Sequence, residues 1–386
     1  MKILWVNPSF LDYRIPVYKR LWELCNGEFY IIFSHNRVPE RIPHKIHKAI
    51  GNNAICFEGE KVIEIGKNEM ANRHIRIPYT TGLYKQIKKI NADIVIAEGF
   101  FQWTPQALKY TIFNKKPLLI SYERTKHTER HCPKWRSLYR KIVDKYTNGY
   151  LCNGSLTKEY LEYIGVNPKK IFIGGMSADS KGLAESTSTI KDSNKESLRK
   201  KLKLNGGITY IYVGQLIERK GVIYLLNAWR KHILKHKQDN LLIVGTGSLY
   251  KEFCKNFSNT PSIIFTGNIE YDHIYQYYAI SDVFIIPTLE DNWSLVVPEA
   301  MACGLPIACS IYNGCYPELI HENINGKLFD PLKENSIIET LDYFHDKNLQ
   351  TMGTASINIE KKFNADTVAN NIYNACKFIL NEKTKF

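Results

Sequence analysis

The chain has 386 residues, 44% of them hydrophobic, and this length favours two globular domains over a single core. Its nine cysteines are scattered and never form a CxxC pair, so neither a disulfide framework nor a zinc site is expected. The apolar run Met1–Val6 is too short for a signal peptide, and no stretch approaches the ~18 apolar residues of a membrane span. These features predict a two-domain protein of a reducing cytoplasm.

The net charge of +14 is concentrated in the first half of the chain. Residues 1–180 carry 29 Lys+Arg against 16 Asp+Glu, whereas the remainder carries 23 against 22. Such asymmetry favours an anionic partner, and anionic lipid headgroups fit best, because no nucleic-acid-binding motif appears. The alternatives are a basic but merely soluble domain, and nucleic-acid binding with a steep salt dependence.

The first half alternates short apolar runs with helical stretches, a pattern typical of a parallel sheet with crossover helices. The expected strands are Lys2–Val6, Phe29–Phe33, Asp93–Ala97, Leu118–Ser121, Gly149–Cys152 and Lys170–Ile173. A polar run, Tyr122–Arg130, follows directly after the fourth of these strands, and ligand sites gather at such strand ends. We therefore take Glu123 and His127 as candidate site residues, although either could be a solvated loop charge.

Residues 133–143 predict a helix with an apolar face and a basic flank. Such a helix can lie on a bilayer surface, but more often it packs on its own sheet. The apolar positions are Trp135, Leu138, Tyr139 and Ile142, and the basic ones are Lys134, Arg136, Arg140 and Lys141.

From residue 177 to 200 the sequence turns polar, which predicts a linker between two domains. Strands are expected again at Ile208–Val213, Asn240–Val244 and Ile263–Thr266. The short Gly-Thr-Gly run after the second of these is interpreted as a tight turn, because a lone GxG is weak support for a phosphate site.

The segment with the most functional motifs begins at Asp282–Pro287, an apolar run that predicts a buried parallel strand. An acidic pair ending in Asp291 follows, and then a helix whose first turn holds Pro298 and which Gly304 ends. Unpaired N–H groups at a helix start suit a phosphate, and Glu299 brings a second carboxylate near Asp291. Together they suggest a nucleotide-sugar site; the alternative is an ordinary strand–helix unit with surface acids.

The pattern Asp291-x7-Glu299 followed by Ala-Met-Ala-Cys-Gly-Leu-Pro306 resembles the EX7E region of retaining glycosyltransferases of family 4. The resemblance implies the GT-B fold: two Rossmann-like, doubly wound α/β domains facing across a cleft. It also implies the domain order. Residues 1–176 would form the acceptor-side domain, 177–200 the linker, 201–364 the nucleotide-sugar domain, and 365–386 a helix that crosses back to the first domain.

A second segment, Gly214–Gly221, is similar to the G-x-L-x-x-x-K-G segment of the same family. There a lysine and an arginine neutralise the donor diphosphate; here Lys220 matches the lysine, and Arg219 replaces the usual arginine, whose place Gln215 holds. The donor contacts implied by the resemblance are Arg219, Lys220, Gly267, Asn268, Glu290, Asp291, Asn292, Trp293, Ser294, Leu295 and Glu299.

The first domain departs from the family in two places. The loop Asn7–Pro16 lacks the paired glycines that approach the diphosphate, and Arg14 is either a substitute charge or a surface arginine. The family's histidine near the reacting carbon is replaced by Glu123. The expected catalytic residues are therefore Glu123, Asp291 and Lys220, with Arg14 and His127 as acceptor-side candidates.

The resemblance implies an enzyme: a retaining, metal-independent glycosyltransferase that transfers a sugar from a nucleotide-sugar to a glycan or lipid-linked acceptor. No Asp-x-Asp motif occurs, so no metal and no other cofactor is expected. The expected location is the cytoplasm, at the inner face of an anionic membrane, with no nucleic-acid partner. The alternatives are a non-catalytic GT-B scaffold, and a nucleotide-sugar hydrolase or phosphorylase on the same fold.

Overall fold

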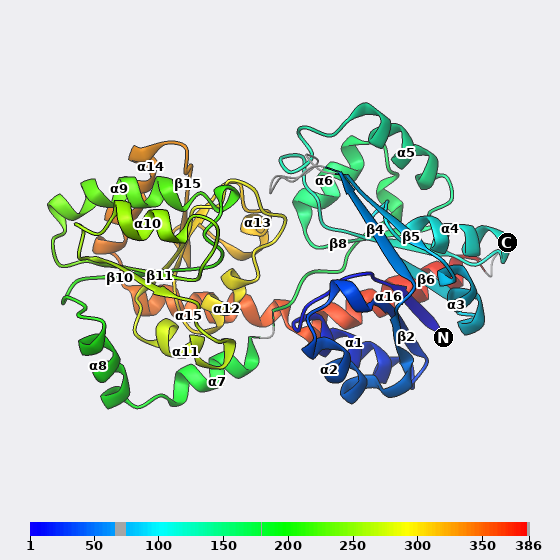
Figure 1. Cartoon of the computed structure of the whole chain (residues 1–386), viewed down its shortest axis with the longest axis horizontal. Coiled ribbons are helices and arrows are strands. Elements are labelled where there is room, and N and C mark those ends of the chain that lie inside the picture. The colour runs from blue at the N-terminus through cyan, green and yellow to red at the C-terminus, as the bar shows by residue number, and fades with distance from the viewer. Residues whose placement is uncertain (66–74, 179, 384–386) are drawn as a thin grey trace. The chain divides into compact units, whose positions relative to one another are not determined.

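The computed structural model describes residues 1–65, 75–178 and 180–383 and divides the chain into two compact α/β units (Figure 1). The first unit comprises Met1–Asp179 and Phe363–Phe386, and the second comprises Ser180–Lys362. The C-terminal segment therefore belongs to the first unit, although it follows the second in sequence.

Within its described residues, the first unit is built on a parallel sheet of seven strands in the order β3-β2-β1-β6-β7-β8-β9. The strands are β1 (Ile3–Val6), β2 (Phe29–Ser34), β3 (Ala54–Phe57), β6 (Ile94–Glu98), β7 (Leu118–Tyr122), β8 (Gly149–Cys152) and β9 (Ile171–Ile173). All six strands expected from the sequence are confirmed, and β3 was not predicted. The helices are α1 (Arg14–Leu24), α2 (Arg41–Ile50), α3 (Leu83–Ile90), α4 (Thr104–Phe113), α5 (Lys134–Asp144), α6 (Ser155–Tyr163) and α16 (Ala365–Lys383).

Helices cover both faces of this sheet because its strands are apolar on both sides. Ile3 and Trp5 of β1 pack with side chains of α1, α2 and α16, whereas Leu4 and Val6 pack with side chains of α3, α4 and α6. Six side chains of α16 are buried on the first face: Val368, Ala369, Ile372, Ala375, Cys376 and Ile379. Each buried valine or isoleucine contributes about 1.5–3 kcal/mol, which holds α16 on the first unit.

A two-stranded antiparallel hairpin adds to the first unit and was not predicted. Its strands are β4 (Glu60–Ile65) and β5 (Ile75–Thr80). The buried carboxylate of Glu60 fastens its base, because it accepts a hydrogen bond from Trp103 Nε1 (2.8 Å) and pairs with Arg37 Nη2 (2.6 Å).

The second unit has a parallel sheet of six strands among its described residues, in the order β12-β11-β10-β13-β14-β15. The strands are β10 (Thr209–Val213), β11 (Asn240–Val244), β12 (Ile263–Gly267), β13 (Val283–Ile286), β14 (Ile307–Ser310) and β15 (Gly326–Phe329). The first four were expected. The helices are α7 (Lys181–Thr189), α8 (Asp192–Lys201), α9 (Val222–Lys235), α10 (Tyr250–Asn256), α11 (Tyr271–Ala279), α12 (Val296–Ala302), α13 (Tyr316–Leu319), α14 (Glu334–Tyr343) and α15 (Leu349–Glu360).

The polar segment 177–200, interpreted above as a linker, folds mainly as α7 and α8 of the second unit. Helix α7 packs against α11 and α12, buries Leu183, and donates a hydrogen bond from Thr187 Oγ1 to Cys303 Sγ (3.3 Å). Most of the serines, lysines and acids within these two helices are exposed or half-buried, which explains why the composition resembles that of a linker.

No helix within the described part of the chain is long and apolar enough to cross a membrane.

Candidate functional site

Both sheets have one point at which the strand order reverses, and ligands of open α/β sheets bind outside the carboxyl ends of the strands at such points. In the second unit the reversal lies between β10 and β13, and in the first unit it lies between β1 and β6. Charged residues proposed from the sequence lie at both reversals.

In the second unit the reversal brings Lys220 and Asp291 into contact. Lys220 ends a short 3₁₀ turn (Glu218–Lys220) that follows β10, and Asp291 follows β13. Lys220 Nζ donates a hydrogen bond to Asp291 Oδ2, and Arg219 Nη1 lies 3.9 Å from the same oxygen. Two motifs 71 residues apart thus form one charged cluster.

Gly221 allows the Lys220 turn to lie against the end of β13. Its φ is +65°, and a Cβ at this position would stand 2.2 Å from the carbonyl oxygen of Pro287. The neighbouring backbone is also joined, because Leu289 N–H donates to the Arg219 carbonyl (2.8 Å). Any side chain at residue 221 would push the Lys220 turn away from Asp291.

The Asp291 carboxylate is held as an anion. Burial alone would raise its pKa, but the Lys220 ammonium, together with hydrogen bonds from Lys220 and Ser294 Oγ (2.6 Å), lowers the pKa below its usual value. Its side chain is only 14% exposed. A buried anion that touches a lysine holds that lysine in a fixed orientation.

The loop between the two acids is already folded onto itself. The Trp293 N–H donates to Asp291 Oδ1 (3.2 Å), and the Ser294 N–H donates to Asn313 Oδ1 (3.3 Å). These two N–H groups, expected to bind the donor, therefore bond within the protein in this structure. The other two residues of this loop that are expected to contact the donor, Asn292 and Leu295, are partly exposed.

Asn313 was not among the site residues proposed from the sequence. Its side chain is buried, and its backbone pairs in parallel with Asp291, so that the Gly314 N–H donates to the Asp291 carbonyl (2.9 Å). The only signal in the sequence was its position in the turn before Tyr316-Pro-Glu.

Glu290 and Glu299 flank this cluster. Glu290 is buried, and its carbonyl accepts a hydrogen bond from Arg219 Nη1 (3.3 Å). Glu299 lies on α12, the helix expected around Pro298, and its carboxylate accepts from the buried Tyr278 Oη (3.4 Å). Burial and the nearby Glu299 raise the pKa of Tyr278 well above its usual value, so the tyrosine remains a donor.

Gly267 and Asn268 lie at the end of β12, two strands from β10 in the sheet. The Gly267 carbonyl accepts from the Gly245 N–H (2.9 Å), while the exposed Asn268 side chain donates to Glu270 (3.2 Å). A Cβ on Gly245 would approach the Gly214 carbonyl oxygen to 2.0 Å, which agrees with the interpretation of this glycine as part of a tight turn.

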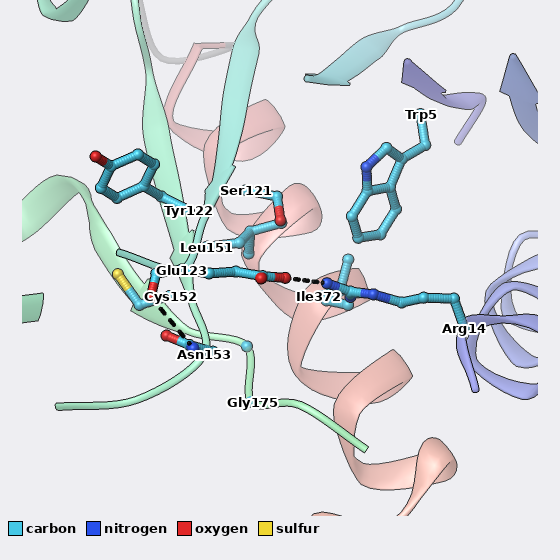
Figure 2. A pocket seen from close by; sticks show the side chains of 11 residues that line it. Trp5, Arg14, Ser121, Tyr122, Glu123, Leu151, Cys152, Asn153, Gly175 and Ile372 are labelled. Atoms are coloured by element: carbon cyan, nitrogen blue, oxygen red, sulfur yellow. Dashed lines mark hydrogen bonds and ion pairs between the residues drawn. The ribbon is translucent and has the colours of Figure 1, made fainter. Parts of the chain in front are cut away.

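In the first unit, a small pocket opens at the reversal, and Figure 2 shows Arg14 and Glu123 pointing toward one another across it. Arg14 Nη2 lies 2.8 Å from Glu123 Oε1. The arginine comes from α1 and the glutamate follows β7. The Arg14 side chain is only 6% exposed. Arg14 is therefore not a surface arginine, which was one of the two alternatives that the sequence left open.

Glu98, the last residue of β6, does not line this pocket but hydrogen-bonds two residues that do, and it was missed in the sequence. It accepts hydrogen bonds from Trp5 Nε1 (3.0 Å) and Ser121 Oγ (3.2 Å). Burial, opposed by Arg14, raises the pKa of Glu98 to about 7. The available signal in the sequence was the position of Glu98 directly after the apolar residues of β6.

His127 does not line this pocket. It is half-buried in the turn before α5, and its carbonyl accepts from the Arg130 N–H (3.3 Å). The structure therefore joins Arg14 with Glu123 and leaves His127 apart from that pair.

Helix α5 also differs from the expectation. Arg140, counted above among the basic surface positions, is buried and donates from Nη2 to Glu129 Oε2 (2.8 Å) and from Nη1 to Tyr160 Oη (2.7 Å). Tyr139 stacks on Phe101, with ring centroids 5.0 Å apart. The remaining apolar positions point outward and are 53%, 63% and 49% exposed, in the order Trp135, Leu138 and Ile142.

Comparison with known proteins finds a matching family and related structures. Residues 194–358 match the glycosyl transferases group 1 family. An uncharacterized glycosyltransferase of Methanocaldococcus jannaschii is 27% identical over 176 residues, which are 44% of this chain and 45% of that protein. A lipopolysaccharide 1,2-N-acetylglucosaminetransferase of Salmonella typhimurium is 27% identical over 169 residues, 40% of this chain and 44% of that one. The chain spans less than half the length of these two relatives.

Among solved structures, HepE of Anabaena in complex with UDP has a TM-score of 0.76 to this chain. The sequences are 15% identical, and the match covers 98% of this chain and 100% of that one. At this identity the similarity concerns the fold, which is that of GT-B glycosyltransferases with two Rossmann-like domains. The chain therefore has the GT-B fold, and its residues 194–358 match the glycosyl transferases group 1 family.

Proposed function

We propose that the protein is a retaining glycosyltransferase of family 4, which moves a sugar from a nucleotide-sugar to a glycan or lipid-linked acceptor. The observation that carries this proposal is the contact between Lys220 and Asp291 at the strand reversal of the second unit. Both residues lie inside the segment that matches the family. The relatives support the class of reaction, because one is named for sugar transfer to lipopolysaccharide.

The charges at this reversal suit a departing nucleoside diphosphate. As the glycosidic bond breaks, negative charge grows on the leaving phosphate, and a fixed cation nearby stabilises it more in the transition state than in the ground state. Lys220 supplies that cation and Arg219 a second one, while Asp291 holds Lys220 in place. Glu299 is proposed to accept hydrogen bonds from donor ribose hydroxyls.

Retention is proposed to follow from a front-side displacement, in which the leaving phosphate helps to deprotonate the acceptor hydroxyl. This route needs neither a covalent nucleophile nor a metal, and rests on positioning and charge.

The pocket of the first unit is proposed to bind the acceptor. Carboxylates accept hydrogen bonds from sugar hydroxyls, and Glu123 is held at the pocket by the buried Arg14. Glu98 adds a second carboxyl group whose pKa of about 7 lets it accept or donate a hydrogen bond near neutral pH. The family's histidine is thus replaced by an arginine–carboxyl cluster.

A lipid-linked acceptor implies work at a membrane, and the outer face of α5 supports that proposal. Trp135, Leu138 and Ile142 are about half exposed or more, and the exposed Lys134 and Lys141 accompany them. Apolar side chains flanked by lysines bind an anionic bilayer interface. We therefore propose peripheral attachment to the cytoplasmic face of the membrane through α5.

Vesicle sedimentation tests this attachment. Wild-type protein is expected to bind vesicles that contain anionic lipid better than neutral ones, and the triple variant Trp135→Ser, Leu138→Ser, Ile142→Ser is expected to lose most of that binding. Phe113→Ser, which removes another exposed apolar side chain from the first unit, is the matched control. Unchanged binding by the triple variant would rule out α5 as the anchor. Arg140 is left intact because it is buried.

The donor site is tested by thermal shift with UDP, GDP, ADP, CMP and dTDP. A ligand bound by the folded state alone adds ~2.7 kcal/mol at a hundredfold excess over its dissociation constant. One diphosphate is expected to raise the melting temperature of wild type, and Glu299→Ala is expected to abolish this shift while remaining folded. A shift that survives in Glu299→Ala would contradict the assignment.

The matching nucleotide-sugars are then tested for transfer to lipid-linked and glycan acceptors, with the anomeric configuration of the product read by NMR. An inverted product would refute retention. Release of free sugar without an acceptor would indicate a hydrolase, and phosphate-dependent release would indicate a phosphorylase. Absence of binding by every diphosphate and of turnover would favour a scaffold.

A further inference from the structure

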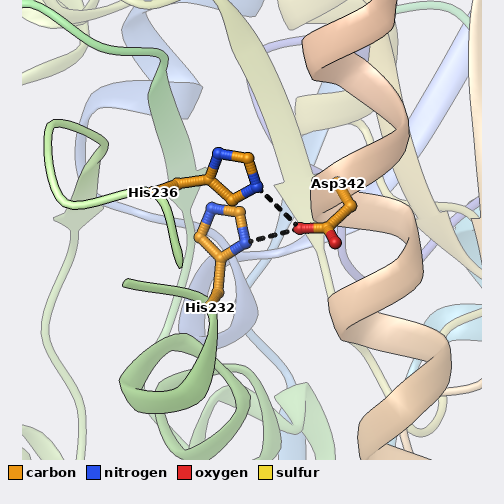
Figure 3. A group of neighbouring side chains, drawn as sticks. All are labelled: His232, His236 and Asp342. Carbon is orange, nitrogen blue, oxygen red and sulfur yellow. Dashed lines mark ion pairs between the residues drawn. The ribbon is translucent and has the colours of Figure 1, made fainter. Parts of the chain in front are cut away.

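A cluster of histidines and acids lies in the second unit at the edge opposite the proposed donor site. His232 is on α9, His236 directly follows that helix, and Asp342 is on α14. Asp239 immediately precedes β11, so the cluster lies at the amino ends of the strands, whereas Lys220 and Asp291 lie at the carboxyl ends. Figure 3 shows both imidazole rings directed at the Asp342 carboxylate. The proposed transfer reaction does not use these residues.

Three atoms of the cluster converge on one point without hydrogen-bond partners. His232 Nδ1 lies 3.3 Å from Asp342 Oδ1, and His236 Nε2 lies 3.1 Å from the same oxygen. All three atoms are buried, and apart from these two nitrogen–oxygen contacts none of them has a partner that forms a hydrogen bond among the described residues. Buried polar atoms are normally satisfied, so three unsatisfied ones in a single group point to a missing ligand.

The separations fit a metal ion between them. Zn²⁺ binds imidazole nitrogen and carboxylate oxygen at about 2.0–2.2 Å in tetrahedral geometry, which places two ligand atoms roughly 3.3 Å apart. The two nitrogen–oxygen distances in this cluster agree with that edge length. One ligand atom from each of the three residues lies within 4.8 Å of the others.

The surrounding contacts leave the His232 and Asp342 ligand atoms available to a metal. His232 Nε2 lies 2.9 Å from Asp239 Oδ2, so a proton on Nε2 leaves the Nδ1 lone pair for a metal. Lys235 Nζ donates to Asp342 Oδ2 (2.7 Å), which leaves Oδ1 as the coordinating oxygen. The ring of His345 stacks on that of His236 at 3.6 Å.

A second histidine–acid group nearby is already satisfied. Asp239 Oδ2 contacts both His232 Nε2 (2.9 Å) and His345 Nε2 (2.8 Å), and Asp239 Oδ1 accepts from the Ile208 N–H (3.0 Å). These contacts account for the Asp239 carboxylate without a metal. The unsatisfied atoms therefore select His232, His236 and Asp342 over this group.

We propose that the second unit carries a divalent transition-metal site, best suited to Zn²⁺, with His232 Nδ1, His236 Nε2 and Asp342 Oδ1 as ligands and water in the fourth position. Two imidazoles and one carboxylate favour Zn²⁺, Co²⁺ or Ni²⁺ over Mg²⁺ or Ca²⁺. His236 and Asp342 are 17% and 29% exposed, which leaves room for solvent at the fourth position. The ion joins the end of α9 to α14 and is structural. The expectation of no zinc site, which was drawn from the cysteines, does not bear on this cluster because no cysteine takes part in it.

Metal titration of the full chain tests this site. Protein stripped with EDTA and desalted is titrated with Zn²⁺ against a chromophoric chelator, and with Co²⁺, whose visible spectrum reports the coordination geometry. We expect one tight equivalent, a tetrahedral Co²⁺ spectrum, and a higher melting temperature on adding Zn²⁺. Weak binding of several equivalents without a tetrahedral spectrum would overturn the proposal.

The ligands are tested by His236→Gln and Asp342→Asn. Each is expected to weaken Zn²⁺ binding at least about 100-fold, since even changes outside the coordination shell cost 10–100-fold. His273→Gln removes an exposed histidine of the same unit and is expected to leave binding unchanged. Tight binding by both His236→Gln and Asp342→Asn would overturn the proposal.

A folded His236→Gln variant is confirmed by its own melting transition, which is expected to be insensitive to Zn²⁺. Loss of binding in His345→Gln together with retention in His236→Gln would assign the metal to the neighbouring group and overturn this ligand set. None of these readouts depends on sugar transfer.

Discussion

In both units the strand order of the sheet reverses at one point, but a carboxyl group near that point has its pKa lowered in one unit and raised in the other. In the second unit the pKa of Asp291 is lowered, because Lys220 and Ser294 outweigh the effect of burial. In the first unit the pKa of Glu98 is raised to about 7, because burial outweighs the effect of Arg14. The reversal of the second unit thus holds an ionised carboxylate against Lys220, whereas that of the first unit holds, beside the Arg14–Glu123 ion pair, a carboxyl group that titrates near neutral pH.

This difference matches the two ligands that we propose. A diphosphate needs a fixed positive charge, which a permanently ionised Asp291 keeps in position. An acceptor presents neutral hydroxyl groups, which a carboxyl group of either state can bind. The two reversals therefore respond differently to substitution and to pH, and the following experiments use that difference.

The largest effect is expected from Lys220→Ala. Removing one preorganised charge at a developing anion costs about 100- to 1000-fold in turnover. Turnover is measured as diphosphate release with saturating acceptor, and the melting temperature checks that the variant folds. Lys231→Ala removes an exposed lysine of the same unit that pairs with Glu334, and near-wild-type turnover is expected. Comparable turnover in the two variants would contradict the role of Lys220.

An intermediate effect is expected from Glu123→Gln in the first unit. Loss of the charged hydrogen bond should lower kcat/KM for the acceptor by about 10- to 100-fold, since such bonds contribute about 1.5–3 kcal/mol. Donor affinity, measured by calorimetry with the diphosphate, should not change. Glu162→Gln, in the same unit, is the matched control because Glu162 is exposed and pairs only loosely with Lys158, at 3.9 Å. A change in donor affinity alone would move Glu123 to the donor site.

A smaller effect is expected from Glu98→Gln and concerns pH. The folded protein binds a proton at Glu98 between about pH 4.5 and about pH 7, where the unfolded chain has released it. Wild type therefore loses stability relative to Glu98→Gln as the pH rises through this window, by on the order of 1 kcal/mol per pH unit.

Urea unfolding at pH 5 and pH 8 measures this difference. Asp291→Asn should show the opposite pH dependence. In wild type the lowered pKa of Asp291 stabilises the fold at pH values above the usual carboxyl pKa, and this stabilisation is lost only as the pH falls below that value. Parallel pH profiles for wild type and Glu98→Gln would show that the buried carboxyl group is not the one that titrates.

The smallest effect is expected from chelation. With no metal in the proposed transfer step, the initial rate in EDTA should stay within about twofold of the untreated rate at a temperature well below the melting point. His236→Gln separates the proposed structural ion from catalysis, because EDTA should then change neither rate nor stability. Loss of rate that Mg²⁺ or Mn²⁺ restores would contradict the metal-independent mechanism.

Local sequence was sufficient for most strands of the two parallel sheets. A strand buried on both faces is a continuous apolar run, and runs such as that of β1 or β13 are visible without any partner. The hairpin β4–β5 was missed because its strands alternate with charged residues. The segment 177–200 was misinterpreted because exposed helices and linkers share a polar composition.

The donor-side residues were also visible in the sequence, since each lies within a motif that follows a strand. The sequence by itself predicted that Lys220 and Asp291 lie near one ligand, but their contact depends on the pairing of β10 with β13. In the first unit, tertiary structure decided almost everything: Arg14, Glu98 and Glu123 come from α1, β6 and the loop after β7. The same holds for His232, His236 and Asp342, because only the packing of α9 against α14 brings Asp342 to the two histidines. Residues adjacent in sequence constrain one another through the backbone, whereas distant ones meet only when the core has formed.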